Sequence, residues 1–174
     1  MFWQCIFLAS TLFTATLSPS APVQRNPVFS GTVVEVMEGD LFKVRTKDWG
    51  DYTVKLWGVD APEVDQPFGK AAKEHLKSMI LKKTVTGDVF DQEKGAQGIL
   101  VGWVKVGDPR KFAIVNELMV TAGLAWPEPM TSNGEIKSTV DLLRKAGEEA
   151  RKAKAGLWSK PNPIAPWEWK KRGT

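Results

Sequence analysis

The chain has 174 residues, a length that supports one domain with a substantial hydrophobic core and is too short for two domains of ordinary size. Hydrophobic residues make up 43% of the sequence and charged residues 25%, which excludes a wholly disordered protein. The formal net charge of +4 favours an anionic partner, although a solvated basic surface would carry the same charge.

The N-terminal segment is an apolar run without charge over residues 1–17, followed by small residues at 18–21. This pattern predicts a secretory signal peptide over residues 1–21 and a short linker over residues 22–30. We therefore expect a secreted or periplasmic protein that is not stably inserted in a membrane after cleavage. Loss of the only cysteine, Cys5, would leave it without a thiol. An uncleaved membrane anchor stays open as an alternative, although the run is short for a membrane span.

Alternation of apolar and polar residues after Ser30 predicts three consecutive strands. Turns at 38–40 and 49–51 separate them. The apolar positions that define the strands are Val34 and Val36, then Phe42 and Val44, and finally Tyr52, Val54 and Leu56. Two further strand-like runs at 84–90 and 99–106 bring the number of predicted strands to five.

Helical spacing of apolar residues marks three segments. The first covers residues 67–81, the second runs over 114–122 and ends at Gly123, and the third begins near Ile136 and ends at Gly156. Glycine is suited to the left-handed cap that ends a helix. Five short strands, with one helix after the third and two after the fifth, fit an α+β protein built on an open Greek-key barrel.

Three carboxylates stand at the turns around the third strand. Asp60 and Glu63 flank Pro62, which restricts the backbone and holds both acids on a defined corner, and Asp40 stands in a turn upstream. Oxygen ligands from separated turns suit a hard divalent cation such as calcium. A solvated surface turn is the alternative interpretation, because Asp and Pro are common turn residues.

Several ordered motifs share one resemblance. They are Asp40 in its turn, Gly-Val-Asp-Ala-Pro-Glu at 58–63, Pro-Phe-Gly at 67–69, Gly-Leu-Ala-Trp at 123–126, Gly-Leu-Trp at 156–158 and the tail segment 163–169. Together they resemble the thermonuclease (staphylococcal nuclease-like) family from about Gly31 to Trp158. The resemblance implies a five-stranded OB-like β-barrel with three helices, forming one domain over 31–158 that is followed by a C-terminal tail over 159–174.

The resemblance also implies roles for the acidic corner. By position, Asp40 and Asp60 match the calcium ligands of the family, with the carbonyl of Ala61 as a further ligand. Glu63 matches the catalytic glutamate, which acts as general base or orients water. The metal-binding and base-like parts of the family site are therefore present in this chain.

The phosphate-binding arginines of the family are replaced. Lys55 occupies the position of the first and Ile99 that of the second, so Lys55 is the remaining catalytic cation and the resemblance implies a reduced rate. Lys94 is a candidate replacement for the missing charge. The predicted nucleic-acid contacts are Lys43, Arg45, Lys55, Lys94 and Lys105.

We therefore expect a monomeric, secreted thermonuclease-like protein that hydrolyses DNA or RNA phosphodiester bonds with calcium. One alternative is a catalytically inactive barrel that binds nucleic acid, favoured by Ile99. A second alternative is a protein-interaction domain at the cell envelope, in which the basic charge is incidental.

Overall fold

The computed structural model describes residues 27–48, 50–93, 98–130 and 136–172. The predicted signal peptide, Lys94 and most of the turn before Ile99 lie outside these residues. No helix in the described part of the chain is long and apolar enough to span a membrane.

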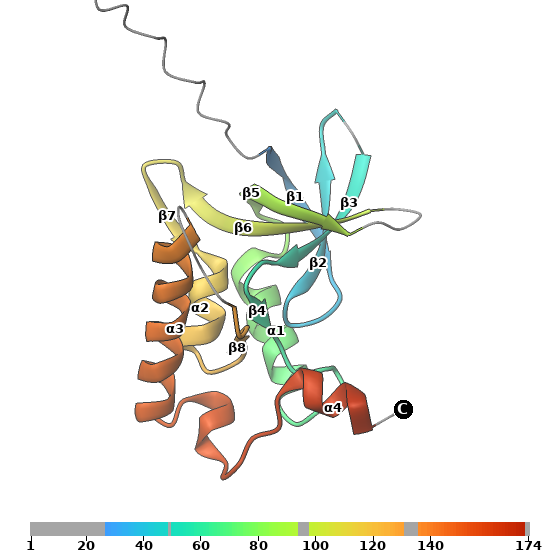
Figure 1. Cartoon of the computed structure of the whole chain (residues 1–174). Coiled ribbons are helices and arrows are strands. Elements are labelled where there is room, and N and C mark those ends of the chain that lie inside the picture. Colours follow the sequence, from blue (N-terminus) through green and yellow to red (C-terminus); the bar gives the residue numbers. More distant parts are fainter. Residues whose placement is uncertain (1–26, 49, 94–97, 131–135, 173–174) are drawn as a thin grey trace, which may run out of the picture.

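The described residues form eight strands, four α-helices and one 3-10 helix (Figure 1). The strands are β1 Val28–Val36, β2 Leu41–Thr46, β3 Gly50–Leu56, β4 Val59–Asp60, β5 Thr84–Glu93, β6 Ile99–Asp108, β7 Lys111–Ile114 and β8 Trp126–Pro127. The helices are α1 Gly69–Ile80, α2 Val115–Thr121, α3 Lys137–Lys152 and α4 Pro166–Arg172, with the 3-10 helix at Gly156–Ser159.

Five strands close into a barrel, as the sequence predicts. The sheet has the order β3-β2-β1-β5-β6-β7, and β3 also pairs with β6, which joins the two sides of the sheet. This closing pair is parallel and sets Thr53 opposite Ile99 and Lys55 opposite Val101, whereas the other pairs are antiparallel. Closure pairs the free edge of β3 with β6, and the short strand β7 remains at the end of the sheet.

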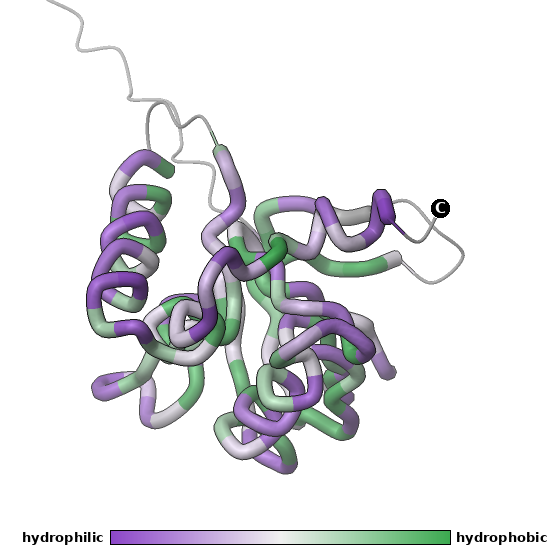
Figure 2. Tube along the Cα trace, turned by 90° about the horizontal axis from the view of Figure 1, so that it is seen from below, coloured by the Kyte–Doolittle hydropathy of each residue, from purple (hydrophilic) through white to green (hydrophobic). Residues whose placement is uncertain are grey.

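The barrel core consists mainly of apolar residues that alternate along the strands, but in β1 the buried residue is Val33 and not the predicted Val34, because the pairing with β2 shifts its register between Val33 and Glu35. Phe42, Val44, Val54 and Leu56 are fully buried, so one face of β2 and β3 points inward. Helix α3 buries Leu143, Ala146, Gly147 and Ala150 at helical spacing and packs on α2, while its other side carries the charged residues (Figure 2).

A buried asparagine joins α2 to the end of the barrel. The Asn116 side chain donates hydrogen bonds to the carbonyls of Trp57 (2.8 Å) and Gly102 (3.2 Å) and accepts one from the N–H of Val104 (2.9 Å). These bonds satisfy backbone groups where β3 ends beside β6. These hydrogen bonds therefore fix the segment that follows β3 and leads to Asp60 and Glu63.

The prediction of three helices is incomplete, because the C-terminal tail contains α4. Pro166 is buried at the start of this short helix, Glu168 lies in its first turn, and Lys170, Lys171 and Arg172 lie in its last turn. Proline suits the first helical position, and acidic and basic residues at these two ends complement the helix dipole. In Figure 1, α4 lies beneath the barrel, near α1.

Candidate active site

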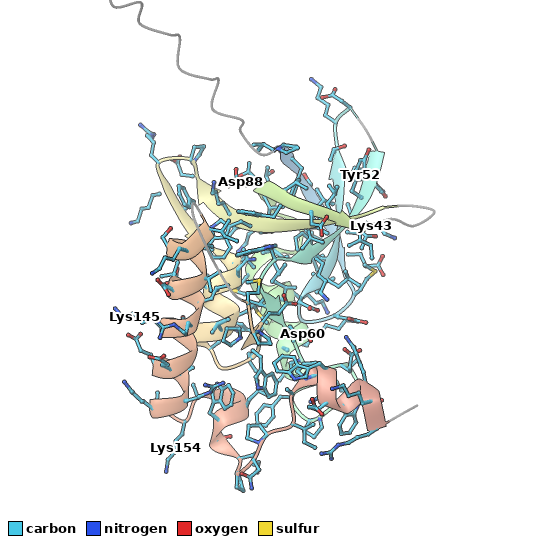
Figure 3. All side chains as sticks on the ribbon, viewed as in Figure 1. Lys43, Tyr52, Asp60, Asp88, Lys145 and Lys154 are labelled. Carbon is cyan, nitrogen blue, oxygen red and sulfur yellow. The ribbon has the colours of Figure 1, made fainter. Side chains whose placement is uncertain are left out.

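Backbone hydrogen bonds and short strands bring the predicted acids together at one end of the barrel. Asp40 directly precedes β2, and its carbonyl accepts a hydrogen bond from the N–H of Leu56 at the end of β3 (2.8 Å). Asp60 lies in β4 and pairs with Trp126 of β8. In Figure 3, Asp60 lies at the end of the barrel nearest α4.

Two glycines permit the close packing of this corner. A Cβ atom on Gly39 would lie 2.7 Å from the Cβ atoms of both Ala61 and Ala72, so a side chain there would separate the Asp40 turn from the Asp60 loop and α1. A Cβ atom on Gly69 would overlap the carbonyl oxygen of Glu63. Glycine at these two positions allows the three segments to meet.

Asp40 and Asp60 are both almost completely buried, with 4% and 8% of their surfaces exposed. Burial raises the pKa of Asp40 from 3.8 to about 7; Lys55 lowers it, and the charges of Asp60 and Glu38 raise it further. The N–H of Ala61 donates a hydrogen bond to Asp40 and also lowers its pKa. The ionised form of Asp40 is therefore poorly stabilised by the protein alone.

Asp60 and Glu38 share this electrostatic environment. Burial is the main cause that raises the pKa of Asp60, while Lys170 and Lys55 lower it and Glu63 raises it. Burial likewise raises the pKa of Glu38, followed by the charge of Glu63. The site is thus a cluster of four interacting carboxylates beside two lysines. We call Glu38, Asp40, Asp60 and Glu63 the acidic cluster.

A buried glutamine fixes the loop that carries Glu63. The Glu63 N–H donates to Oε1 of Gln66 (3.2 Å), and the Gln66 N–H donates to the Glu63 carbonyl (2.9 Å). Nε2 of Gln66 donates to the carbonyl of Ile164 in the C-terminal tail (2.6 Å). The same side chain therefore holds both the Glu63 loop and the segment before α4.

Lys170 of α4 reaches the acidic cluster. Its Nζ lies 2.9 Å from Oε1 of Glu63, and the two side chains are 53% and 24% exposed. Burial lowers the pKa of Lys170, but the hydrogen bond to Glu63 and the charges of Asp60, Glu63 and Asp40 outweigh burial and raise it. Lys170 is therefore a charged partner of the cluster.

Of the cations that the sequence predicts to contact nucleic acid, only Lys55 among the described residues acts on the acidic cluster. The charge of Lys55 on β3 lowers the pKa values of Asp40, Asp60 and Glu38, while its predicted contact with phosphate stays a prediction. The other three predicted contacts that the structure describes each pair with a carboxylate of the barrel: Lys43 with Glu35 (3.3 Å), Arg45 with Asp51 (2.8 Å) and Lys105 with Asp88 (2.7 Å). In the view of Figure 3, Lys43 lies farther from α4 than Asp60 does.

Ile99 begins β6 opposite Thr53, two residues before Lys55 on β3. Leu41 of β2 lies opposite Lys55, and Val101 of β6 flanks it on the other side. The neighbours of Lys55 on these strands are therefore apolar. The side chain of Ile99 is uncharged, so this position does not supply the positive charge of an arginine.

The oxygen ligands available for a metal come from few side chains. In the described ranges, no three Asp, Glu, His or Cys side chains form a group that could hold a metal ion. Asp40 and Asp60 would therefore need backbone oxygen, such as the carbonyl of Ala61, and water to complete a coordination shell. Calcium accepts such mixed oxygen ligands, and two buried carboxylates with raised pKa values would be stabilised by it.

Three residues of this site have no role in the sequence prediction. Glu38 stands two residues before Asp40, and Gln66 stands three residues after Glu63, so local spacing could have indicated both. Lys170 lies far along the chain from the acids. Lys170 directly follows the tail motif at 163–169 and begins a basic run, which is its signal in the sequence.

Comparisons with known proteins agree with this geometry. Residues 53–160 match the family model described as staphylococcal nuclease homologue. A protein named "Uncharacterized endonuclease" from Escherichia coli O157:H7 is 34% identical over 142 residues, which cover 82% of this chain and 85% of that protein. The micrococcal nuclease of Shigella flexneri is 30% identical over 148 residues, covering 82% and 81% of the two chains.

Proposed function

Since the chain belongs to the staphylococcal nuclease family, we propose that it hydrolyses phosphodiester bonds of DNA or RNA with calcium bound at Asp40 and Asp60. The observation that carries this proposal is the placement of Glu63 beside the buried Asp60, whose pKa its charge raises, in a cluster that also contains the buried Asp40. Membership of a nuclease family indicates the reaction class, phosphodiester hydrolysis, and the carboxylates of the acidic cluster are the groups that would perform it.

Glu63 is suited to accept a proton from water. As the water oxygen forms a bond to phosphorus, its proton passes to the Glu63 carboxylate, and the bond from phosphorus to one sugar oxygen breaks. The departing oxygen takes up a proton, so one water molecule is consumed and a phosphate monoester and a hydroxyl are formed. Gln66 holds Glu63 in place for this step, because it accepts a hydrogen bond from the Glu63 N–H and donates one to the Glu63 carbonyl.

Positive charge is needed where the phosphate oxygens become more negative. Calcium bound by Asp40 and Asp60 would supply charge to neutralise the phosphate. We assign the contact with a non-bridging oxygen to Lys55, and the support is that its charge lowers the pKa values of both Asp40 and Asp60. Lysine lacks the planar two-point grip of arginine, and an arginine at such a position is worth about 10³-fold or more, so we propose a reduced rate.

Cleavage assays test the proposal directly. We expect the purified chain to cleave single-stranded DNA or RNA with calcium and to stop when a chelator is added. Glu63→Gln should remove cleavage, whereas Glu74→Gln, which changes an exposed glutamate paired with Lys77 on α1, should not. Full calcium-dependent cleavage by an Asp60→Ala variant would contradict the assignment of the metal ligands.

A nucleic-acid-binding protein without turnover is the second candidate, and Ile99 favours it. The direct cross-strand neighbours of Lys55, Leu41 and Val101, are apolar, and Ile99 brings no charge to the position where the family has its second arginine. In that case the chain would bind single-stranded nucleic acid with strong salt dependence and leave it intact.

We also propose that the protein is exported and acts as a monomer. The support for export is the uncharged apolar run over residues 1–17 with small residues after it. Fractionation of cells and sizing of the mature protein test these two points. Retention of the full-length chain in the cytoplasm, or a stable dimer, would contradict them.

A further inference from the structure

The ion pair between Lys170 and Glu63 joins the C-terminal helix to the residue proposed as general base. Lys170 lies outside residues 53–160, the part of the chain that matches the family model. Its Nζ also acts electrostatically on Asp60 and Glu38, which Lys55 faces as well. Two lysines from distant parts of the chain therefore border one set of carboxylates.

The position of Lys170 follows from the packing of the tail. Gln66 is 5% exposed and binds the Ile164 carbonyl, and Pro166 is buried at the first turn of α4. The N–H groups of Glu168 and Trp169 both donate to the carbonyl of Ala165, which closes that turn. The helix is thus attached to the same loop that carries Glu63, so base and lysine are positioned together.

Stability alone does not account for this pair. Lys170 is about half exposed, and ion pairs at exposed positions contribute little to folding. Exposure instead leaves the ammonium group accessible to a ligand in the site. An ammonium group carries three N–H donors, so one can remain on Glu63 while another donates to a phosphate oxygen.

We propose that Lys170 binds the scissile phosphate together with Lys55 and supplies the second cation that Ile99 cannot provide. This inference rests on the proposed nuclease function. In this arrangement Lys170 meets a non-bridging oxygen while it keeps Glu63 oriented toward the attacking water, and the C-terminal helix is part of the catalytic site.

Substitution of Lys170 in the full chain, with its neighbour as a matched control, tests the inference. Lys171 lies on the same helix and pairs with Glu168 (3.1 Å), so Lys171→Met removes the same charge away from Glu63. We expect Lys170→Met to lower kcat on single-stranded DNA by about 100-fold, the effect of losing one donor to transition-state charge. Lys170→Arg should retain most of the activity, and Lys171→Met should stay within about twofold of the parent.

Salt dependence gives a readout that a merely structural role would not change. Loss of one phosphate contact reduces the slope of log affinity against log salt by about 0.7 for single strands. We expect this reduction in Lys170→Met, measured with a labelled single-stranded DNA, and no such reduction in Lys171→Met. Equal thermal midpoints of both variants would confirm that the difference is not one of folding.

Each result decides between distinct explanations. Wild-type kcat and an unchanged salt slope in Lys170→Met would overturn the inference, and faster cleavage would show that Lys170 inhibits the base. If the parent itself does not cleave, the proposed nuclease function fails, and the salt slopes alone decide whether Lys170 contacts phosphate. If the parent cleaves and Glu63→Gln does not, only the Lys170 variants bear on this inference.

Discussion

Asp40 should make the stability of the calcium-free protein depend on pH. Burial raises its pKa from 3.8 to about 7 despite the opposing effect of Lys55, and the charges of Asp60 and Glu38 add to the rise. Between these two pH values the folded protein holds a proton that the unfolded chain has released. Stability therefore falls as the pH rises from about 3.8 to about 7, and this group adds no pH dependence outside that window.

The size of this effect follows from the two pKa values. Their difference corresponds to about 4 kcal/mol, at about 1.36 kcal/mol for each pH unit. An Asp40→Asn variant keeps the shape of the side chain and cannot ionise. We expect it to exceed the parent in stability by up to about 4 kcal/mol above pH 7 and to match it closely at the acidic end of the window.

Urea unfolding across this pH window, in the presence of a chelator, measures the difference. Asp65→Asn is the matched control, because Asp65 is exposed in the loop next to Glu63 and its replacement changes the net charge equally. The control should follow the parent at every pH. A constant difference between Asp40→Asn and the parent over the whole window would refute the reasoning, since no proton would then be linked to folding at Asp40.

Calcium extends the same experiment to the proposed ligand role. A ligand present at about 100 times its Kd stabilises the folded state by about 2.7 kcal/mol, so calcium should stabilise the parent above pH 7. Asp40→Asn should gain much less, because it has lost one of the two carboxylate ligands. An equal gain in both proteins would place the calcium elsewhere.

Three further substitutions test the structure around the acidic cluster. Gly69→Ala should cost roughly 1–3 kcal/mol in urea unfolding and slow cleavage, because the new methyl group collides with the Glu63 carbonyl; unchanged stability would contradict this packing. Ile99→Arg should raise cleavage about tenfold or more by adding a cation on the face that carries Lys55, and an unchanged rate would show that this face does not contact the phosphate. Asn116→Ala should cost about 1–3 kcal/mol for each buried backbone group left without a partner, measured by urea unfolding; a loss below 1 kcal/mol would contradict that role.

The barrel could be predicted from the sequence because its strands have one buried face. Phe42, Val44, Val54 and Leu56 alternate with polar residues, and this period is what a closed sheet with a packed interior requires. The strand β7 and the two-residue pair of β4 and β8 were not predicted. Short strands of this kind depend on tertiary pairing and leave little pattern in the sequence.

The candidate site was predicted in part for a similar reason. Asp60 and Glu63 follow one another across Pro62, so their proximity is local and visible in the sequence. The contact of Lys170 with Glu63 depends on how the tail folds back over the barrel, which no spacing encodes. A helix as short as α4 also has weak intrinsic stability, and it forms here because Pro166 and the preceding segment pack on the body of the protein.

The balance of charge in the site connects its stability with its proposed function. Four carboxylates and the two lysines, Lys55 and Lys170, leave a charge of −2 when all are ionised. A divalent cation would neutralise this excess, whereas the protein alone relieves it by raising the pKa of Asp40. Removal of Lys170 would increase the excess and strengthen retention of a cation while weakening the grip on phosphate. Opposite changes in calcium affinity and in DNA affinity on Lys170→Met would therefore distinguish a phosphate ligand from a residue that only balances the charge of the acids.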